Sequence, residues 1–206
     1  MSYSDQFSKK FFARLLKPAG NNPQRDRASS FSIVFEELDK MNKDDYTIVE
    51  TGCMRQDHGD LAFGDDGAST YIFDDFINYY DGQVISVDLC QANVDYANSM
   101  TSDRTTAYCS DSVEFLWNIR LKGTIDFLYL DSYDIERENP HPSQLHHVKE
   151  LCAIIRKCRK GTIICVDDHD GFFTGGLIGK GNYVKDFMEN IGAELLYEGY
   201  QIVWKM

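Results

Sequence analysis

No apolar run in the 206-residue sequence approaches the length of a membrane span, and the stretch MSYSDQFSKKFF lacks the sustained apolar core of a secretory signal. Positive charge is also scarce, because 21 Lys and Arg residues stand against 33 Asp and Glu residues and leave a formal net charge of −12. Nucleic acids and anionic membrane surfaces would repel such a chain. We therefore expect a cytoplasmic protein that binds neither nucleic acid nor membrane.

Several common binding motifs are missing as well. The six cysteines show no zinc-finger pairing, and several lie within apolar runs, as buried reduced thiols do. The dinucleotide-binding pattern G-x-G-x-x-G and the Walker pattern of P-loop proteins are both absent. The glycine-rich stretch GGLIGKG (175–181) has no strand before it and favours a flexible substrate loop, and the acidic stretch 57–66 favours a solvated loop.

From residue 46 onward, short apolar segments alternate with segments of helical periodicity. This alternation predicts parallel strands joined by right-handed helical crossovers, in a sheet covered on both faces. Two further strands near the end of the sequence predict a closing antiparallel hairpin. The expected strands are 46–50, 83–89, 105–109, 125–131, 162–168, 193–199 and 200–206, and the expected helices between them are 69–80, 91–100, 111–120, 143–160 and 181–192.

The first 45 residues differ from the rest and predict a helical extension that packs on the core domain of residues 46–206. Residues 4–17 and 29–41 carry amphipathic helical patterns, separated by a linker. The apolar stripe FFARLL would suit an intramolecular contact or a homo-oligomer contact equally well, so the oligomeric state stays open.

Carboxylates crowd the end of one expected strand. In GTIICVDDHD (161–170) an apolar run typical of a buried strand is followed at once by Asp167, Asp168, His169 and Asp170. Ionised carboxylates at the end of a buried element are costly unless positive charge lies among them. The pattern therefore indicates that a cation is held at this place.

Other strands also end in acidic or small polar residues. Ligands of parallel sheets bind beyond the carboxyl ends of the strands, near the point where strand order reverses, and an Asp at the tip of the second strand is suited to the hydroxyls of a ribose. We therefore expect a nucleoside-type ligand at this edge. The residues concerned are Glu50, Thr51 and Gly52 after the first strand, Asp88 at the second, Ser110, Asp111 and Ser112 after the third, and Asp131 at the fourth.

In order and spacing, the segments E-T-G, G-A-S-T, V-D and S-D-S resemble those of the class I S-adenosylmethionine-dependent methyltransferases. The resemblance spans residues 46–206 and implies an α/β fold: a Rossmann-like, mostly parallel seven-stranded sheet with an antiparallel C-terminal hairpin strand and helices on both faces. It departs from the family in a long insert between Gly52 and Gly67. The cofactor residues that it implies are Glu50, Gly52, Gly67, Ser69 and Thr70 on the methionine and ribose side, Asp88 at the ribose hydroxyls, and Asp111 and Ser112 at the adenine.

Within that family, LYLDSYD and IICVDDHD look most like the metal-dependent O-methyltransferases of the catechol and macrocin types. The resemblance implies a divalent cation, Mg²⁺ foremost, held by Asp131, Asp167 and Asp168. Such a cation would lower the pKa of a substrate hydroxyl, which would then attack the sulfonium methyl group. The expected substrate is a small hydroxylated molecule such as a sugar or glycoside.

The general base is less clearly indicated. Asp131, His146 and His169 are the candidates, with Tyr133 and Asp134 behind them. Two other functions stay open at this point. An iron-dependent hydroxylase that resembles the cephalosporin-hydroxylase type would use Asp131, Asp167 and His169 as ligands, and a non-catalytic member of the fold would only bind a nucleoside.

Overall fold

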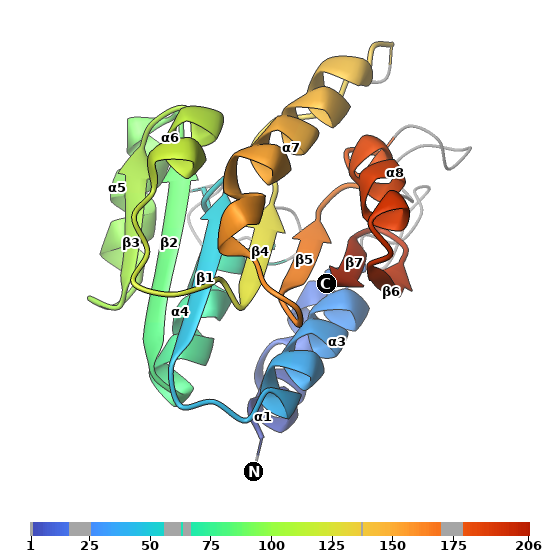
Figure 1. Ribbon diagram of the computed structural model, residues 1–206. Helices are drawn as coiled ribbons and strands as arrows, with labels where there is room; N and C mark the ends of the chain where they lie inside the picture. The colour runs from blue at the N-terminus through green and yellow to red at the C-terminus, as the bar shows by residue number, and fades with distance from the viewer. Residues whose placement is uncertain (1, 17–25, 56–62, 64–66, 137, 170–178) are drawn as a thin grey trace.

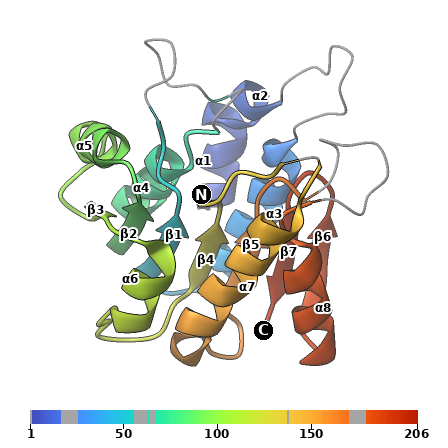
Figure 2. The same ribbon diagram turned by 90° about the horizontal axis from the view of Figure 1, so that it is seen from above.

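The computed structural model describes residues 2–16, 26–55, 63, 67–136, 138–169 and 179–206. These residues form a seven-stranded sheet with helices on both faces (Figures 1 and 2), in the strand order β3-β2-β1-β4-β5-β7-β6. The order reverses between β1 and β4, which is where such sheets bind ligands. The strands are β1 (Tyr46–Thr51), β2 (Gly82–Asp88), β3 (Thr105–Cys109), β4 (Phe127–Leu130), β5 (Ile163–Val166), β6 (Glu194–Glu198) and β7 (Ile202–Lys205).

The last strand confirms the expected antiparallel element. β7 pairs antiparallel with both β5 and β6, whereas the pairs that β1 to β5 form with one another are all parallel. The hairpin therefore does not simply extend the edge of the sheet, because β7 returns into the gap between β5 and β6. This return brings the turn before β7 close to the end of β5, where the sequence predicts a cation.

Alternation along the strands divides the core between the two faces of the sheet. In β4, Phe127 and Tyr129 pack on one side with helices α3 (Arg27–Lys40) and α4 (Ser69–Tyr79). Leu128 and Leu130 pack on the other side with α6 (Ser112–Asn118), α7 (His141–Ile154) and α8 (Asn182–Asn190). Both sets are fully buried, which explains why the strands are continuous apolar runs. The helices are α4 (Ser69–Tyr79), α5 (Gln91–Met100), α6 (Ser112–Asn118), α7 (His141–Ile154) and α8 (Asn182–Asn190), with a 3-10 turn at Ile155–Lys157.

The amino-terminal helices share the core of the sheet. They are α1 (Tyr3–Lys10), α2 (Phe12–Leu15) and α3 (Arg27–Lys40). Phe35 of α3 lies 4.8 Å from Tyr3, 4.9 Å from Phe7 and 5.4 Å from Phe76 of α4, measured between ring centroids. Of the stripe FFARLL, Phe11 and Leu15 are buried within the chain itself. None of the described helices is long and apolar enough to cross a membrane.

Replacing Phe35 by Ala should lower the free energy of unfolding by about 3–5 kcal/mol, because its fully buried ring contacts aromatic side chains of α1 and α4. Chemical denaturation of both proteins measures the difference. Leu145→Ala is the control, because that side chain is 48% exposed and its loss should cost little. Similar losses in the two variants would contradict the shared core.

Candidate functional site

A small cavity lies where the strand order reverses. Its volume is about 180 Å³, and it opens between the ends of β1, β2 and β4. Three residues predicted from the sequence, Gly52, Asp88 and Asp131, lie together in its wall. The full lining is Gly52, Cys53, Arg55, Asp88, Asn93, Asp131, Ser132 and Asp134.

Gly52 lets two strand ends approach each other. Its φ of +79° is favourable only for glycine. A Cβ at this position would also overlap the backbone carbonyl of Asp131. The glycine therefore brings the end of β1 against the first acid of the predicted cluster.

Asp88 ends β2 at the cavity wall. One of its oxygens, Oδ1, accepts hydrogen bonds from the Cys90 amide at 2.7 Å and from Asn93 Nδ2 at 3.3 Å. These bonds fix the carboxylate, and no described residue donates to Oδ2. Asp88 can therefore accept from a ligand hydroxyl, as the sequence predicts for a ribose.

Glu50 has a different environment from the one expected for a ligand contact. Its carboxylate is fully buried and accepts hydrogen bonds from Ser69 (2.5 Å), Thr70 (2.7 Å) and Ser86 (2.6 Å). These bonds tie β1 to β2 and to the start of α4. Glu50, Ser69 and Thr70 thus lie together, but none of them is part of the cavity wall.

Gly67 lies against the amino-terminal extension. Its φ is +83°, and an added Cβ would come within 2.8 Å of Arg27 Cδ. The glycine therefore leaves room for the Arg27 side chain to pass from α3 toward the ends of β4 and β5. Except for Gly52, Cys53, Met54, Arg55 and Phe63, the long insert lies outside the described residues, including its four aspartates.

Asp111 and Ser112 lie on the far side of the cavity from the acids of β5. Asp111 caps α6 by accepting from the Glu114 amide at 2.9 Å. Ser112 Oγ lies 2.9 Å from His146 Nε2, and the same nitrogen is 3.4 Å from Glu150. The structure thus brings a predicted adenine contact together with a predicted base, at the packing of α6 on α7.

The three acids predicted to bind metal do converge. One side-chain oxygen from each of Asp131, Asp167 and Asp168 lies within 4.8 Å of the other two. Asp131 also lines the small cavity, so the cluster and the cavity are contiguous. Oxygen ligands in this number suit a hard cation such as Mg²⁺.

Two side-chain cations already lie among these acids. Lys180 Nζ is 2.5 Å from Asp131 Oδ1 and 3.0 Å from Asp168 Oδ2. Arg27 donates to both oxygens of Asp167, with Nε at 3.1 Å from each and the terminal nitrogen at 2.5 Å from Oδ2. With these side chains in place, the three acids do not fit an additional dication. Each acid already pairs at least one oxygen with a nitrogen of Lys180 or Arg27.

Further donors complete the cluster. Gln201 Nε2 donates to Asp167 Oδ1 at 2.7 Å, and the Tyr200 hydroxyl donates to Asp168 Oδ1. The Arg27 guanidinium also lies over the Tyr200 ring, 4.9 Å from its centroid. Both residues belong to the turn that leads into β7, so the returning strand supplies part of the site.

The surroundings of Asp131 and Asp168 shift the pKa values of the two carboxyls in opposite directions. Burial raises the pKa of Asp131 well above its usual value; Lys180 opposes this effect, and the two nearby carboxylates add to it. Burial also raises the pKa of Asp168, but Lys180, Arg27 and the Tyr200 hydroxyl outweigh it, so the net pKa is lowered. Asp131, at the cavity wall, is therefore the stronger base of the pair.

His169 lies apart from the acid cluster. Its ring is buried, and Nε2 is 3.3 Å from Glu198 Oε1. Among the described residues, the group formed by Asp131, Asp167 and Asp168 is the only set of His, Cys, Asp or Glu with metal-ligand spacing. A facial iron site that includes His169, as the hydroxylase alternative requires, is therefore not assembled in the part of the chain described.

Arg27, Lys180, Tyr200 and Gln201 are the site residues that the sequence analysis missed. Lys180 lies in GGLIGKG, where glycines on both sides of a lone lysine were the available signal. Of that stretch, residues 175–178 lie outside the described residues, as does Asp170. Arg27 lies where the expected linker meets the second helix, and nothing in the local pattern distinguishes it.

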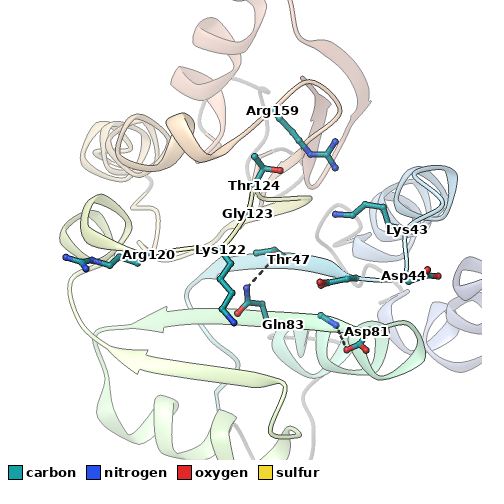
Figure 3. Close-up of a pocket in the computed structure, with 12 residues that line it drawn as sticks. Lys43, Asp44, Thr47, Asp81, Gln83, Arg120, Lys122, Gly123, Thr124 and Arg159 are labelled. Atoms are coloured by element: carbon teal, nitrogen blue, oxygen red, sulfur yellow. Dashed lines mark hydrogen bonds between the residues drawn. The ribbon is translucent and has the colours of Figure 1, made fainter.

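A larger hollow of about 1030 Å³ opens at the amino-terminal ends of the strands (Figure 3), beside the first residues of β1 and β2. Lys43 and Arg159 in its wall are both paired with the buried Asp126, at 2.6 and 2.8 Å. Parallel sheets bind ligands beyond the carboxyl ends of their strands. We therefore assign the site to the cavity at those ends, although it is the smaller of the two.

No family model matches the chain, and no curated protein matches it. Two solved methyltransferases are similar to it over 98% of its length. One is MycE, from the mycinamycin biosynthetic pathway, in complex with Mg and SAH, with a TM-score of 0.64 and 16% sequence identity. The other is CalS11, a calicheamicin methyltransferase, with a TM-score of 0.59 and 12% identity.

The match covers 54% of MycE and 91% of CalS11, so the chain spans about half the length of the first and most of the second. The apo structure of CalS11, described as a TDP-rhamnose 3'-O-methyltransferase, matches with a TM-score of 0.55. Together with the strand order, these similarities show that this chain has the fold of the class I S-adenosylmethionine-dependent methyltransferases. The fold prediction made from the sequence is confirmed.

His147, next to the candidate base, provides a test of packing behind the site. It is fully buried on α7, and its Nδ1 donates to the Ser143 carbonyl at 2.7 Å. Burial lowers the pKa of His147 from its usual 6.5 to about 4. The unfolded chain therefore binds a proton below pH 6.5 that the folded chain does not take up until about pH 4.

Stability should consequently fall by up to about 3 kcal/mol through this residue as the pH falls from 6.5 to 4. In His147→Gln this part of the pH dependence should vanish, which urea denaturation at a series of pH values measures. The control is His141→Gln, an exposed position on the same helix that should keep the wild-type dependence. Parallel profiles for all three proteins would mean that His147 is not buried in neutral form.

Proposed function

We propose that this protein is an S-adenosylmethionine-dependent O-methyltransferase that acts on a small hydroxylated molecule, with a sugar or glycoside as the first candidate. The observation that carries the proposal is the contact between cavity and cluster: Asp131 belongs to both. The fold adds support, since CalS11 and MycE are methyltransferases and the apo form of CalS11 is described as acting on TDP-rhamnose.

The charge at the site suits the methyl donor. Three carboxyl groups face the cations of Arg27 and Lys180, so the cluster has one negative charge in excess when all three are ionised. A sulfonium ion in the adjoining cavity would balance that charge. Asp88 would hold the ribose hydroxyls of the same cofactor at the other end of the cavity.

In the proposed reaction, the acceptor oxygen attacks the sulfonium methyl carbon. A carbon–oxygen bond forms while the carbon–sulfur bond breaks, and sulfur keeps the electron pair, so the cofactor leaves as S-adenosylhomocysteine. The hydroxyl proton passes to Asp131, which lines the cavity and whose pKa is raised by burial. Alignment of oxygen, methyl carbon and sulfur supplies much of the rate.

A metal-assisted form of the proposal keeps Asp131, Asp167 and Asp168 as ligands of a dication, Mg²⁺ foremost. The mutual spacing of their oxygens favours it, and one of the two similar methyltransferases, MycE, was solved with Mg. This form requires Lys180 to leave two of the three carboxylates.

Asp88→Asn should weaken the binding of S-adenosylhomocysteine about 10- to 100-fold, because a hydrogen bond from a ribose hydroxyl to a charged acceptor is worth about 1.5–3 kcal/mol. Isothermal titration calorimetry measures the affinity. Asp95→Asn is the matched control, an exposed aspartate on α5 outside the cavity wall. Equal affinities for the wild type and Asp88→Asn would remove Asp88 from the cofactor site.

The activity itself is tested with S-adenosylmethionine that carries a labelled methyl group. We expect label to pass to at least one hydroxylated acceptor in a panel of sugars, nucleotide sugars, glycosides and phenols, and Asp131→Asn to slow the transfer about 100-fold or more because it removes the proton acceptor. Asp95→Asn should retain the wild-type rate. If the wild type bound neither S-adenosylmethionine nor S-adenosylhomocysteine, the proposed function would be wrong.

A further inference from the structure

We propose that the ammonium group of Lys180 is the resident cation of the carboxylate cluster, in the place that a divalent metal ion would take, and that methyl transfer at this site needs no metal. The part that concerns the reaction rests on the proposed function. The part that concerns what occupies the cluster does not, and it can be tested separately.

The position of the ammonium is the first argument. Lys180 Nζ lies between Asp131 and Asp168, at 2.5 and 3.0 Å, and the lysine side chain is 1% exposed. A metal ion that used the same two carboxylates would have to bind the oxygens that already face this nitrogen. A lysine and a dication cannot share so small a space, because their like charges repel at short range.

Asp167 does not offer a free oxygen to a metal ion either. Its carboxylate is fully buried and accepts from Arg27 through both oxygens and from Gln201 through Oδ1. A third ligand for a metal ion would therefore break a buried arginine–carboxylate pair. Such a pair is costly to break because it leaves an uncompensated charge.

The backbone fixes Lys180 at this position. Its amide donates to the Asp168 carbonyl at 3.0 Å, and the Gly179 carbonyl accepts from Gln144 Nε2 at 3.1 Å. A Cβ at Gly179 would overlap the His169 carbonyl, and one at Gly181 would lie 2.9 Å from His169 Nδ1. The segment therefore packs on the chain after β5 with bare glycines on both sides of the lysine, and α8 begins directly after it.

These contacts explain the local sequence G-K-G. The glycines allow the close approach, and the single side chain between them points its charge at the acids. The geometry is that of a lysine placed for the cluster.

The test is a titration of the protein with Mn²⁺ alone, followed by calorimetry and by the electron paramagnetic resonance signal of the free ion. We expect the wild type to show no saturable binding at the cluster. Lys180→Met removes the ammonium and leaves three carboxylates against one arginine, so it should gain affinity for Mn²⁺ by about tenfold or more.

Two matched variants show that the gain belongs to the cluster. Lys180→Arg keeps the positive charge and should not gain Mn²⁺ binding. Lys180→Met combined with Asp131→Asn removes one ligand and should lose most of the gain. Because Lys180→Met breaks a buried ion pair, its melting temperature should drop by about 10 °C in the absence of metal, and Mn²⁺ should restore part of this loss only in that variant.

A second arm measures methyl transfer. The wild type should keep its rate in excess chelator, and Lys180→Met should lose about 100-fold and recover part of the rate when Mn²⁺ or Mg²⁺ is added. A purely structural lysine would show no such metal rescue. Loss of wild-type activity in chelator, with recovery on adding metal, would overturn the inference.

Saturable Mn²⁺ binding by the wild type that Asp131→Asn abolishes would also overturn it, whatever the enzyme does. This result needs only proteins with Lys180 in place, so it stands even if Lys180→Met fails to fold. Conversely, absence of cofactor binding would refute the proposed function and leave the result on cluster occupancy intact. The two failures are therefore distinguishable.

Discussion

The candidate site depends on keeping three carboxylates close together in a largely buried place. Asp131, Asp167 and Asp168 can do so because Arg27 and Lys180 lie among them. Removal of either cation would leave negative charge uncompensated in a medium of low polarity, where it is far more costly than in water. The segments that carry these cations are therefore required parts of the site.

Several elements around the sheet therefore supply partners for the three carboxylates. Helix α3 brings Arg27 across Gly67 to the end of β5, and the chain before α8 brings Lys180 between the acids. The return of β7 adds Tyr200 and Gln201 from the other side. The amino-terminal helices thus do more than cover the sheet, since one of them neutralises an acid of the cluster.

Much of the fold was predictable because its signals are local and periodic. Buried parallel strands such as Phe127–Leu130 and Ile163–Val166 are continuous apolar runs, and the helices between them carry the expected spacing. The errors are at the ends: the helix expected over 143–160 ends at Ile154 and continues only as a 3-10 turn, although its apolar pattern runs further. That β7 lies between β5 and β6 is a matter of long-range pairing, which no local pattern contains.

The convergence of the acids was predictable for a related reason, since residues that follow neighbouring parallel strands share one edge of the sheet. Their cations were not, because no local pattern distinguishes Arg27, the first residue of α3, or Lys180, which lies in the irregular stretch before α8, and only packing brings them to the acids. The same holds for His146 and His169, whose rings turn toward Ser112 and Glu198. The sequence thus predicted where positive charge is needed, but not that Arg27 and Lys180 supply it.

The bonds around Arg27 join segments from near opposite ends of the sequence. Its guanidinium also donates to the hydroxyl of Tyr200, a separation of 173 positions along the chain. Closing so long a loop costs conformational entropy, which these bonds must offset. During synthesis, a fragment that ends between Asp168 and Lys180 would therefore carry all three acids and Arg27 but not Lys180, and the site would stay incomplete until residues 180–201 had been added.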